Sequence, residues 1–273
     1  MPLELDTRHR AMLREMGVHV WLPESAIPPV DVLPAAQATT ASVSLKTTTV
    51  ASPATPAGAP APGTALVPVT PTGEPLSLEA MDWQTLAQTA ASCQACGLCA
   101  GRKNTTLQAP SEAIHSDWLV LGDPPDEDED RLAQAFAGPA GVLLDNMLKA
   151  AGARRGGRGR NGAYASNVVK CRPSNGRLPH TTELQQCAQY LQREVALVQP
   201  KLILAMGRFA TQLLLQDHPQ EAALPLGKQR GVVYRYQGIP VVVTYHPKVL
   251  LRASADKAKA WADLCLAMDV LDT

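Results

Sequence analysis

The pattern of apolar and polar positions divides the chain of 273 residues into three parts. In residues 1–23 an apolar set recurs at helical spacing, and Gly17 follows where a helix C-cap residue belongs, which predicts a short helical peptide. Residues 24–76 consist mainly of Pro, Ala, Thr and Val and cannot pack a core, so they are predicted to form a disordered, extended linker. Residues 77–273 are the predicted folded domain.

Within the folded domain, short apolar runs alternate with amphipathic stretches. The predicted strands are 118–122, 164–169, 201–207, 232–236 and 239–244. The predicted helices are one capped by Ser77, then 139–152, 182–198 and 257–271. This alternation predicts an α/β fold with a central, mainly parallel sheet and flanking helices. Because ligands bind at the carboxyl ends of such strands, the expected functional positions are Gly122-Asp-Pro-Pro125, Asn167, Met206-Gly207 and His246-Pro247.

Charge and cysteine content bear on the cellular compartment and on the binding partners of the protein. Lys plus Arg and Asp plus Glu are each 25, so the formal charge of zero gives no whole-chain signal for nucleic acid. Basic residues do cluster locally, in the Gly-rich stretch 153–160 and again in 170–177. Six cysteines without a signal segment indicate a reducing cytoplasm, and no apolar run is long enough to span a bilayer. We therefore expect a cytoplasmic monomer without a membrane anchor.

Four of the cysteines form a predicted metal-ligand set. Cys93 and Cys96 are a C-x2-C pair, while Cys171 and Cys187 lie far along the chain. A pair joined by two distant cysteines is typical of an iron–sulfur or metal site. Spacing alone leaves zinc open, because zinc also takes four thiolates. Cys99 and Cys265 are interpreted as ordinary buried thiols.

The segments around these cysteines resemble the family 4 uracil-DNA glycosylases. The resemblance rests on Asn167-Val-Val-Lys-Cys-Arg-Pro173 and Thr244-Tyr-His-Pro247, and it covers about residues 90–270. It implies the three-layer uracil-DNA glycosylase fold, a DNA-repair hydrolase that cleaves the N-glycosidic bond of uracil in DNA, and a [4Fe–4S] cluster on the four cysteines.

The resemblance also implies roles for single residues. Asn167 would read the uracil edge, because its amide offers a donor for O4 and an acceptor for N3–H. Phe136 would stack on the base, and His246 would donate a hydrogen bond to O2 as negative charge builds on the leaving base. Asp123 would supply the catalytic carboxylate that orients water or stabilises the sugar cation.

The same resemblance implies DNA contacts. The cluster would hold the loop that carries Arg172 and Arg177 rigid against DNA phosphates. The basic stretch would add flexible phosphate contacts through Arg154 and Arg155.

The segment from Gly122 to Phe136 departs from the family pattern. Asp123 replaces a glutamate, Asp126 replaces a glycine, and Ala133 and Ala135 replace the glycine and proline that lead to Phe136. The run of five acids at 126–130 is expected to repel phosphates. Two interpretations follow: an active glycosylase, or a degenerate domain that only recognises DNA.

The N-terminal peptide resembles the start of the psi subunit of bacterial DNA polymerase III. Leu13 to Trp21 has the short helix, the Gly-Val step and a tryptophan three residues later. The resemblance implies that Met16, Val18 and Trp21 anchor the chain on the tau/gamma collar of the clamp loader, with the linker as tether. The alternative is a helix docked on the main domain. Combined with a degenerate site, the peptide would make the chain a non-catalytic psi-like adaptor.

Overall fold

A computed structural model of the chain describes residues 12–13, 15–16, 78–111 and 114–273. The chain divides into two compact units, of which one, Trp21–Thr70, lies wholly outside the described residues. The predicted linker at 24–76 therefore stays a prediction. The other unit, Met1–Val20 with Pro71–Thr273, contains all the described residues. No helix among them is both long and apolar enough to cross a membrane.

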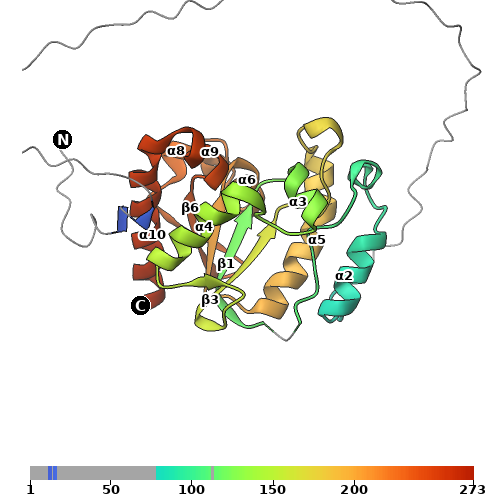
Figure 1. The fold of residues 1–273 in the computed structure, drawn as a ribbon, viewed down its shortest axis with the longest axis horizontal. Coiled ribbons are helices and arrows are strands. Elements are labelled where there is room, and N and C mark those ends of the chain that lie inside the picture. The colour runs from blue at the N-terminus through green and yellow to red at the C-terminus, as the bar shows by residue number, and fades with distance from the viewer. Residues whose placement is uncertain (1–11, 14, 17–77, 112–113) are drawn as a thin grey trace, which may run out of the picture. The chain divides into compact units, whose positions relative to one another are not determined.

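A six-stranded sheet in the order β2-β3-β1-β4-β6-β5 forms the centre of this unit (Figure 1). The strands are β1 (Ser116–Gly122), β2 (Arg154–Arg155), β3 (Gly159–Asn167), β4 (Leu202–Met206), β5 (Val233–Tyr236) and β6 (Ile239–Thr244). All neighbouring pairs are parallel except β5 with β6, which are antiparallel. The central strand β4 is buried along its whole length, as continuous apolar runs in parallel sheets are.

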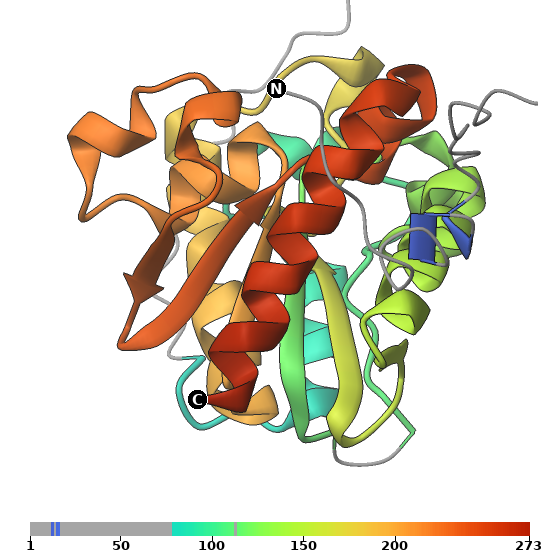
Figure 2. The same ribbon diagram turned by 90° about the vertical axis from the view of Figure 1, so that its left-hand side faces the viewer.

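Helices cover both faces of the sheet, so the predicted three-layer α/β fold is confirmed. The helices α2 (Trp83–Ser92), α5 (Thr181–Val198) and α6 (Arg208–Leu214) pack on one core with Leu119, Leu121 and Ile203. On the opposite core, α4 (Gly138–Ala150) and α10 (Lys257–Asp272) pack with Trp118, Val120 and Leu204. Alternate residues of β1 and β4 point to opposite cores because side chains alternate along a strand. Figure 2 shows α10 lying along its face of the sheet.

Short helices fill the connections between these elements. They are η1 (Gly97–Gly101), α3 (Glu127–Leu132), η2 (Ser174–Gly176), α7 (Pro219–Ala222), α8 (Leu226–Gln229), α9 (Pro247–Arg252) and η3 (Ser254–Asp256). The predicted helix starts are close but not all right. The first long helix begins at Trp83, where Asp82 caps it by accepting a hydrogen bond from Thr85 N at 2.8 Å, and not at Ser77, which lies outside the described residues.

The described residues of the N-terminal peptide pack against the main domain. Leu13 and Met16 are 1% and 2% exposed and belong to the core beside α4 and α10. Glu15 lies 3.3 Å from Lys149 Nζ, and Lys257 Nζ donates to Met16 O at 3.3 Å. These contacts favour the docked-helix interpretation. Val18 and Trp21, the other two predicted anchors, lie outside the described residues.

Ala133 ends α3 in the left-handed backbone region, with a φ of 54°. A side chain other than glycine is strained there by about 1 kcal/mol. We expect Ala133→Gly to raise the free energy of unfolding by about that amount, measured by urea denaturation. The matched change Ala196→Gly, at an exposed position of α5, should lower stability by about 1 kcal/mol. A loss of stability in Ala133→Gly would contradict the assignment of strain.

Candidate active site

Four predicted functional segments meet at the carboxyl edge of the sheet. Gly122, the last residue of β1, pairs with Asn167, the last of β3. Met206 of β4 pairs with Thr244 of β6, two residues before His246. Since the strands are parallel, their ends bring side chains that are far apart in sequence to one edge.

Phe136 and His246 stack on each other above this edge. Their ring centroids are 5.1 Å apart and the ring planes are inclined by only 9°. Both side chains are buried, with exposures of 0% and 1%. Gly122 lies against the pair: a Cβ atom at position 122 would come within 2.5 Å of Phe136 Cζ and 3.2 Å of His246 Nε2. The stack thus requires glycine at the end of β1.

His246 is held as a neutral hydrogen-bond donor. Its Nδ1 accepts from the backbone N–H of Lys248 at 3.2 Å, so the ring proton is on Nε2. Burial, together with the nearby charge of Lys248, lowers the pKa of His246 to about 3, against a smaller opposite effect of Asp126. Nε2 is buried and has no hydrogen-bond partner. Buried polar atoms are nearly always hydrogen-bonded, so this unpartnered donor at the strand ends is a candidate contact for a ligand.

Asn167 has a fixed amide with one unpartnered atom. Its Nδ2 donates to Asp123 O at 2.9 Å and to Glu129 Oε1 at 3.0 Å, which uses both hydrogens. Its Oδ1 is buried without a partner. The sequence suggested that this amide would offer a ligand both a donor and an acceptor. In the structure the atom left over is the acceptor.

The carboxylate of Asp123 faces the start of α6. Its Oδ1 accepts from Phe209 N at 2.8 Å, and a Cβ atom at position 207 would lie only 2.2 Å from its Oδ2. Gly207, with a φ of 100°, makes room for it. Burial raises the pKa of Asp123, while the backbone N–H groups of Phe209 and Ala210 partly oppose this shift. The predicted catalytic carboxylate of Asp123 thus directly follows β1, and a backbone N–H holds it in place.

The acidic run at 126–130, expected to repel phosphates, is only partly on the surface, and its exposed charges are paired. Glu129 and Asp130 are fully buried. Asp130 accepts hydrogen bonds from the backbone N–H groups of Lys103 and Asn104.

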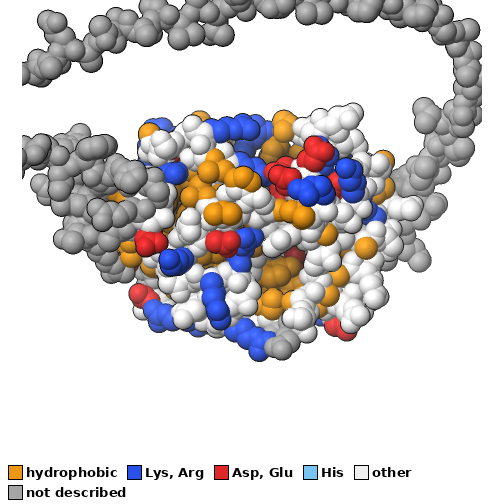
Figure 3. All heavy atoms as spheres, in the orientation of Figure 1, with side chains coloured by type: hydrophobic (Ala, Val, Ile, Leu, Met, Phe, Trp, Pro, Cys, Tyr) orange, Lys and Arg blue, Asp and Glu red, His pale blue; other side chains and the backbone are white. Residues whose placement is uncertain are grey.

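The remaining three acids each form an ion pair with a cation: Asp126 with Lys248 at 2.8 Å, Asp128 with Arg131 at 2.8 Å, and Glu127 with Arg172 at 3.4 Å. Figure 3 shows acidic and basic side chains next to one another over α3.

The four predicted ligand cysteines line one cavity, together with Cys99. Arg102 donates to Cys171 Sγ at 3.2 Å, and the backbone N–H of Lys170 donates to Cys187 Sγ at 3.3 Å. Burial raises the pKa of the Cys187 thiol to about 12, and the charge and backbone N–H of Lys170 oppose this shift. Among the described residues, no group of three or more His, Cys, Asp or Glu side chains is placed so that it could hold a metal ion. Five thiols line this cavity and N–H groups point at two of the sulfurs, which is a donor set of the kind that iron–sulfur clusters use.

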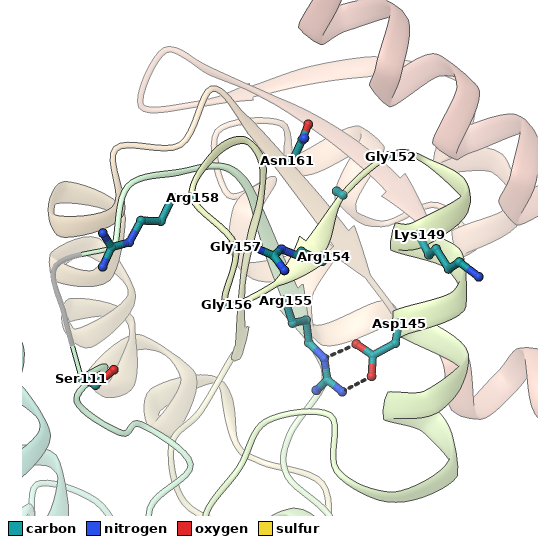
Figure 4. A pocket seen from close by; sticks show the side chains of 11 residues that line it. Ser111, Asp145, Lys149, Gly152, Arg154, Arg155, Gly156, Gly157, Arg158 and Asn161 are labelled. Carbon is teal, nitrogen blue, oxygen red and sulfur yellow. Dashed lines mark hydrogen bonds and ion pairs between the residues drawn. The ribbon is translucent and has the colours of Figure 1, made fainter.

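The predicted phosphate contacts are engaged within the protein to different degrees. Arg155 forms a bidentate ion pair with Asp145, with both N–O distances 2.6 Å (Figure 4). Its Nη1 also donates to Phe136 O at 3.1 Å. Arg177 forms a bidentate ion pair with Glu183, with N–O distances of 2.6 and 2.8 Å. Arg154 lines an open hollow of about 1040 Å³, together with Lys149, near the amino end of β3. Arg154 therefore lies at the opposite end of the strands from Asn167.

Sequence reasoning missed two buried groups beside the site. Glu129 contacts Asn167, and its signal was the Asp-x-x-Glu spacing of a capping box, which α3 indeed forms with Asp126. Lys170, 2% exposed, donates to Glu194 Oε2 at 2.5 Å and to Asn167 O at 2.8 Å. No sequence pattern predicts the Lys170–Glu194 pair, because the two residues belong to different segments of the fold.

The neutral His246 should make stability depend on pH. An unfolded histidine titrates near 6.5, whereas the folded one takes up a proton only near pH 3. The stabilisation is therefore complete above pH 6.5 and is lost as the pH falls, by about 1.4 kcal/mol per unit. We expect His246→Gln to flatten the unfolding free energy between about pH 6.5 and about pH 5 relative to the wild type. The exposed His115→Gln should keep the wild-type slope; equal slopes in all three proteins would refute the neutral assignment.

Comparison with known proteins places this site in context. Residues 110–265 match the family model of the uracil DNA glycosylase superfamily. The chain is 33% identical over 191 residues to a type-4 uracil-DNA glycosylase of Pyrobaculum aerophilum, covering 68% of this chain and 93% of the relative. A type-4 uracil-DNA glycosylase of Archaeoglobus fulgidus is 33% identical over 165 residues, 59% of this chain and 78% of the relative. A type-5 enzyme of Pyrobaculum aerophilum matches a shorter stretch of 87 residues at 30% identity.

Proposed function

Since the chain belongs to the uracil DNA glycosylase superfamily, we propose that it is a DNA-repair hydrolase that cleaves the N-glycosidic bond of uracil in DNA. The observation that carries this proposal is the pair of unpartnered buried atoms, Asn167 Oδ1 and His246 Nε2. One is an acceptor and the other a donor. Uracil offers the matching pair, because its N3–H is a donor and its O2 is an acceptor.

In the proposed reaction the target base leaves the DNA stack and enters the pocket. Phe136, Asn167 and His246 are each at most 1% exposed, so the pocket has to open before a base can bind. Asn167 Oδ1 then accepts from N3–H. The neutral His246 donates from Nε2 to O2 and stabilises the negative charge that develops as the bond breaks, which such donors do most effectively in a site without water. Asp123, at the same strand end, stabilises the cationic sugar and directs water to its C1′ atom.

The proposal is tested by measuring uracil release from single- and double-stranded DNA. Wild-type protein should convert the uracil nucleotide to an alkali-labile abasic site, and Asn167→Ala should be severely impaired. The exposed Asn161→Ala is the matched control and should act like the wild type. A wild type that is as inert as Asn167→Ala would refute excision and favour the non-catalytic adaptor.

We further propose a [4Fe–4S] cluster on Cys93, Cys96, Cys171 and Cys187. Four thiols on one cavity and the hydrogen bonds to Cys171 and Cys187 support it. The cluster would tie the C-x2-C segment to the loop after Asn167 and to α5. Its contribution here is structural: it would fix the backbone that carries Arg172, which with Arg177 and Arg154 remains a predicted contact to DNA phosphates.

Removing a ligand should remove the cluster. We expect anaerobically purified protein to be brown, with about four irons per chain, and Cys171→Ser to lose colour and iron. Cys265→Ser should keep both, since Cys265 lies on α10 in the opposite core. Iron and acid-labile sulfide assays with the visible absorbance measure this. Colourless wild type with one zinc per chain would refute the assignment.

Binding of residues 1–23 to the tau/gamma collar of the clamp loader stays a prediction. It rests on the likeness of Leu13 to Trp21 to the psi subunit. Because Met16 is buried against the domain, such binding would require the helix to leave its place or to bind through its other face. A pull-down of clamp-loader proteins that does not depend on Trp21 would end the hypothesis.

A further inference from the structure

Glu129 is a fully buried carboxylate that joins four segments of the site. Its Oε2 accepts from Asp126 N at 3.0 Å and from Lys248 Nζ at 2.6 Å. Its Oε1 accepts from Phe136 N at 2.7 Å and from Asn167 Nδ2 at 3.0 Å. A buried carboxylate is tolerated when its oxygens are satisfied in this way, and removing its charge leaves the donors without their acceptor.

The first consequence concerns the orientation of Asn167. With Glu129 Oε1 on one side and Asp123 O on the other, the amide nitrogen has two acceptors to face. Turning the amide over would direct Oδ1 at those two oxygens and lose both hydrogen bonds. Glu129 therefore keeps Oδ1, an acceptor, as the atom that can meet a base. Such an acceptor fits a base with a hydrogen on N3 and opposes cytosine, whose N3 is itself an acceptor.

The second consequence concerns the two rings. Phe136 has a φ of 53°, a strained value for a side chain of its size. Its backbone is held from both sides, with the N–H bound to Glu129 and the C=O bound to Arg155 Nη1 at 3.1 Å. Lys248, whose ammonium contacts Glu129, provides the backbone N–H that sets the His246 tautomer. Burial opposes the charge of Lys248, but Glu129 and Asp126 outweigh this and raise its pKa.

We propose that Glu129 is the positioning residue that sets the base selectivity of the pocket, by locking the Asn167 amide with its oxygen toward the N3 position of the base. This inference rests on the proposed function. The substitution Glu129→Gln is nearly isosteric, but the amide that it introduces could present N–H to Asn167. The Asn167 amide could then turn over and offer Nδ2 to the base, which suits the N3 acceptor of cytosine.

The test measures binding and not turnover. The probes are two single-stranded oligonucleotides that differ in one nucleotide, 2′-fluoro-2′-deoxyuridine or 2′-fluoro-2′-deoxycytidine, whose fluorine slows cleavage. Wild type should bind the uracil probe about tenfold more tightly, because the cytosine base leaves Asn167 Oδ1 unsatisfied. In Glu129→Gln the ratio should fall to about threefold or less. Glu127→Gln changes the same charge on the same helix at an exposed position and should keep the wild-type ratio.

The outcomes separate the two proposals. If the wild type does not distinguish the probes, the proposed function fails and this inference fails with it. If the wild type prefers uracil and folded Glu129→Gln does so equally, only the role of Glu129 is overturned. Should Glu129→Gln not fold, Asn167→Asp places a second carboxylate beside Glu129, and adding Glu129→Gln to it should raise the melting temperature. A double variant no more stable than Asn167→Asp would also overturn the proposal.

Discussion

Replacing Lys170 with methionine should lower the free energy of unfolding by about 3–5 kcal/mol. The ammonium and the carboxylate of Glu194 are 2.5 Å apart, and their side chains are 2% and 0% exposed. Without Lys170 the carboxylate stays buried and loses its counter-ion. The variant also loses the hydrogen bonds to Ser166 Oγ at 2.7 Å and Asn167 O at 2.8 Å.

Denaturant unfolding measures this loss of unfolding free energy, and two further variants serve as its controls. Lys201→Met breaks a pair with Asp117 in which the lysine is 69% exposed, and it should cost less than about 1 kcal/mol. Combining Lys170→Met with Glu194→Leu should recover part of the loss, because no charge then remains buried alone. A cost for Lys170→Met as small as that for Lys201→Met would show that the buried pair is not formed.

Replacing His246 with alanine should reduce the rate of uracil release by about a hundred- to a thousandfold. The variant lacks the Nε2–H donor that meets the developing charge on the base. Single-turnover measurement on single-stranded uracil DNA isolates this step from product release. His115→Ala, at an exposed histidine before β1, is the matched control and should retain the wild-type rate. A loss of less than about threefold in His246→Ala would remove His246 from the reaction.

The apolar runs were sufficient to predict the fold class and five of the six strands, but not the short edge strand β2, which lies in the basic Gly-rich stretch. Strands such as Leu202–Met206 are buried on both faces, so their composition marks them as central. The strands β1, β3 and β6 end at Gly122, Asn167 and Thr244, where β3 stops two residues before the predicted run 164–169 does, and parallel pairing brings these ends to one edge. His246 follows β6 and is placed by this rule, whereas Phe136 lies just before α4, so only the family resemblance brought it to the same edge.

The burial of acids could not be predicted in the same way. Five consecutive acids indicate a solvated surface by composition, yet Glu129 and Asp130 are fully buried. Their partners, such as Asn167, Lys248 and Lys103, come from distant segments, and only the folded arrangement brings those donors together. Arg155 is the converse case: a basic residue in a Gly-rich stretch that supports the backbone of Phe136.

The closed stack of Phe136 on His246 affects how such a protein searches DNA. Every base that is tested, whether damaged or normal, has to separate the same two rings first. A cost common to all candidates reduces every affinity by the same factor and cancels from the ratio between any two of them. In the proposed reaction the stack therefore lowers the affinity for every nucleotide alike, while the choice between nucleotides is made only after the rings have parted.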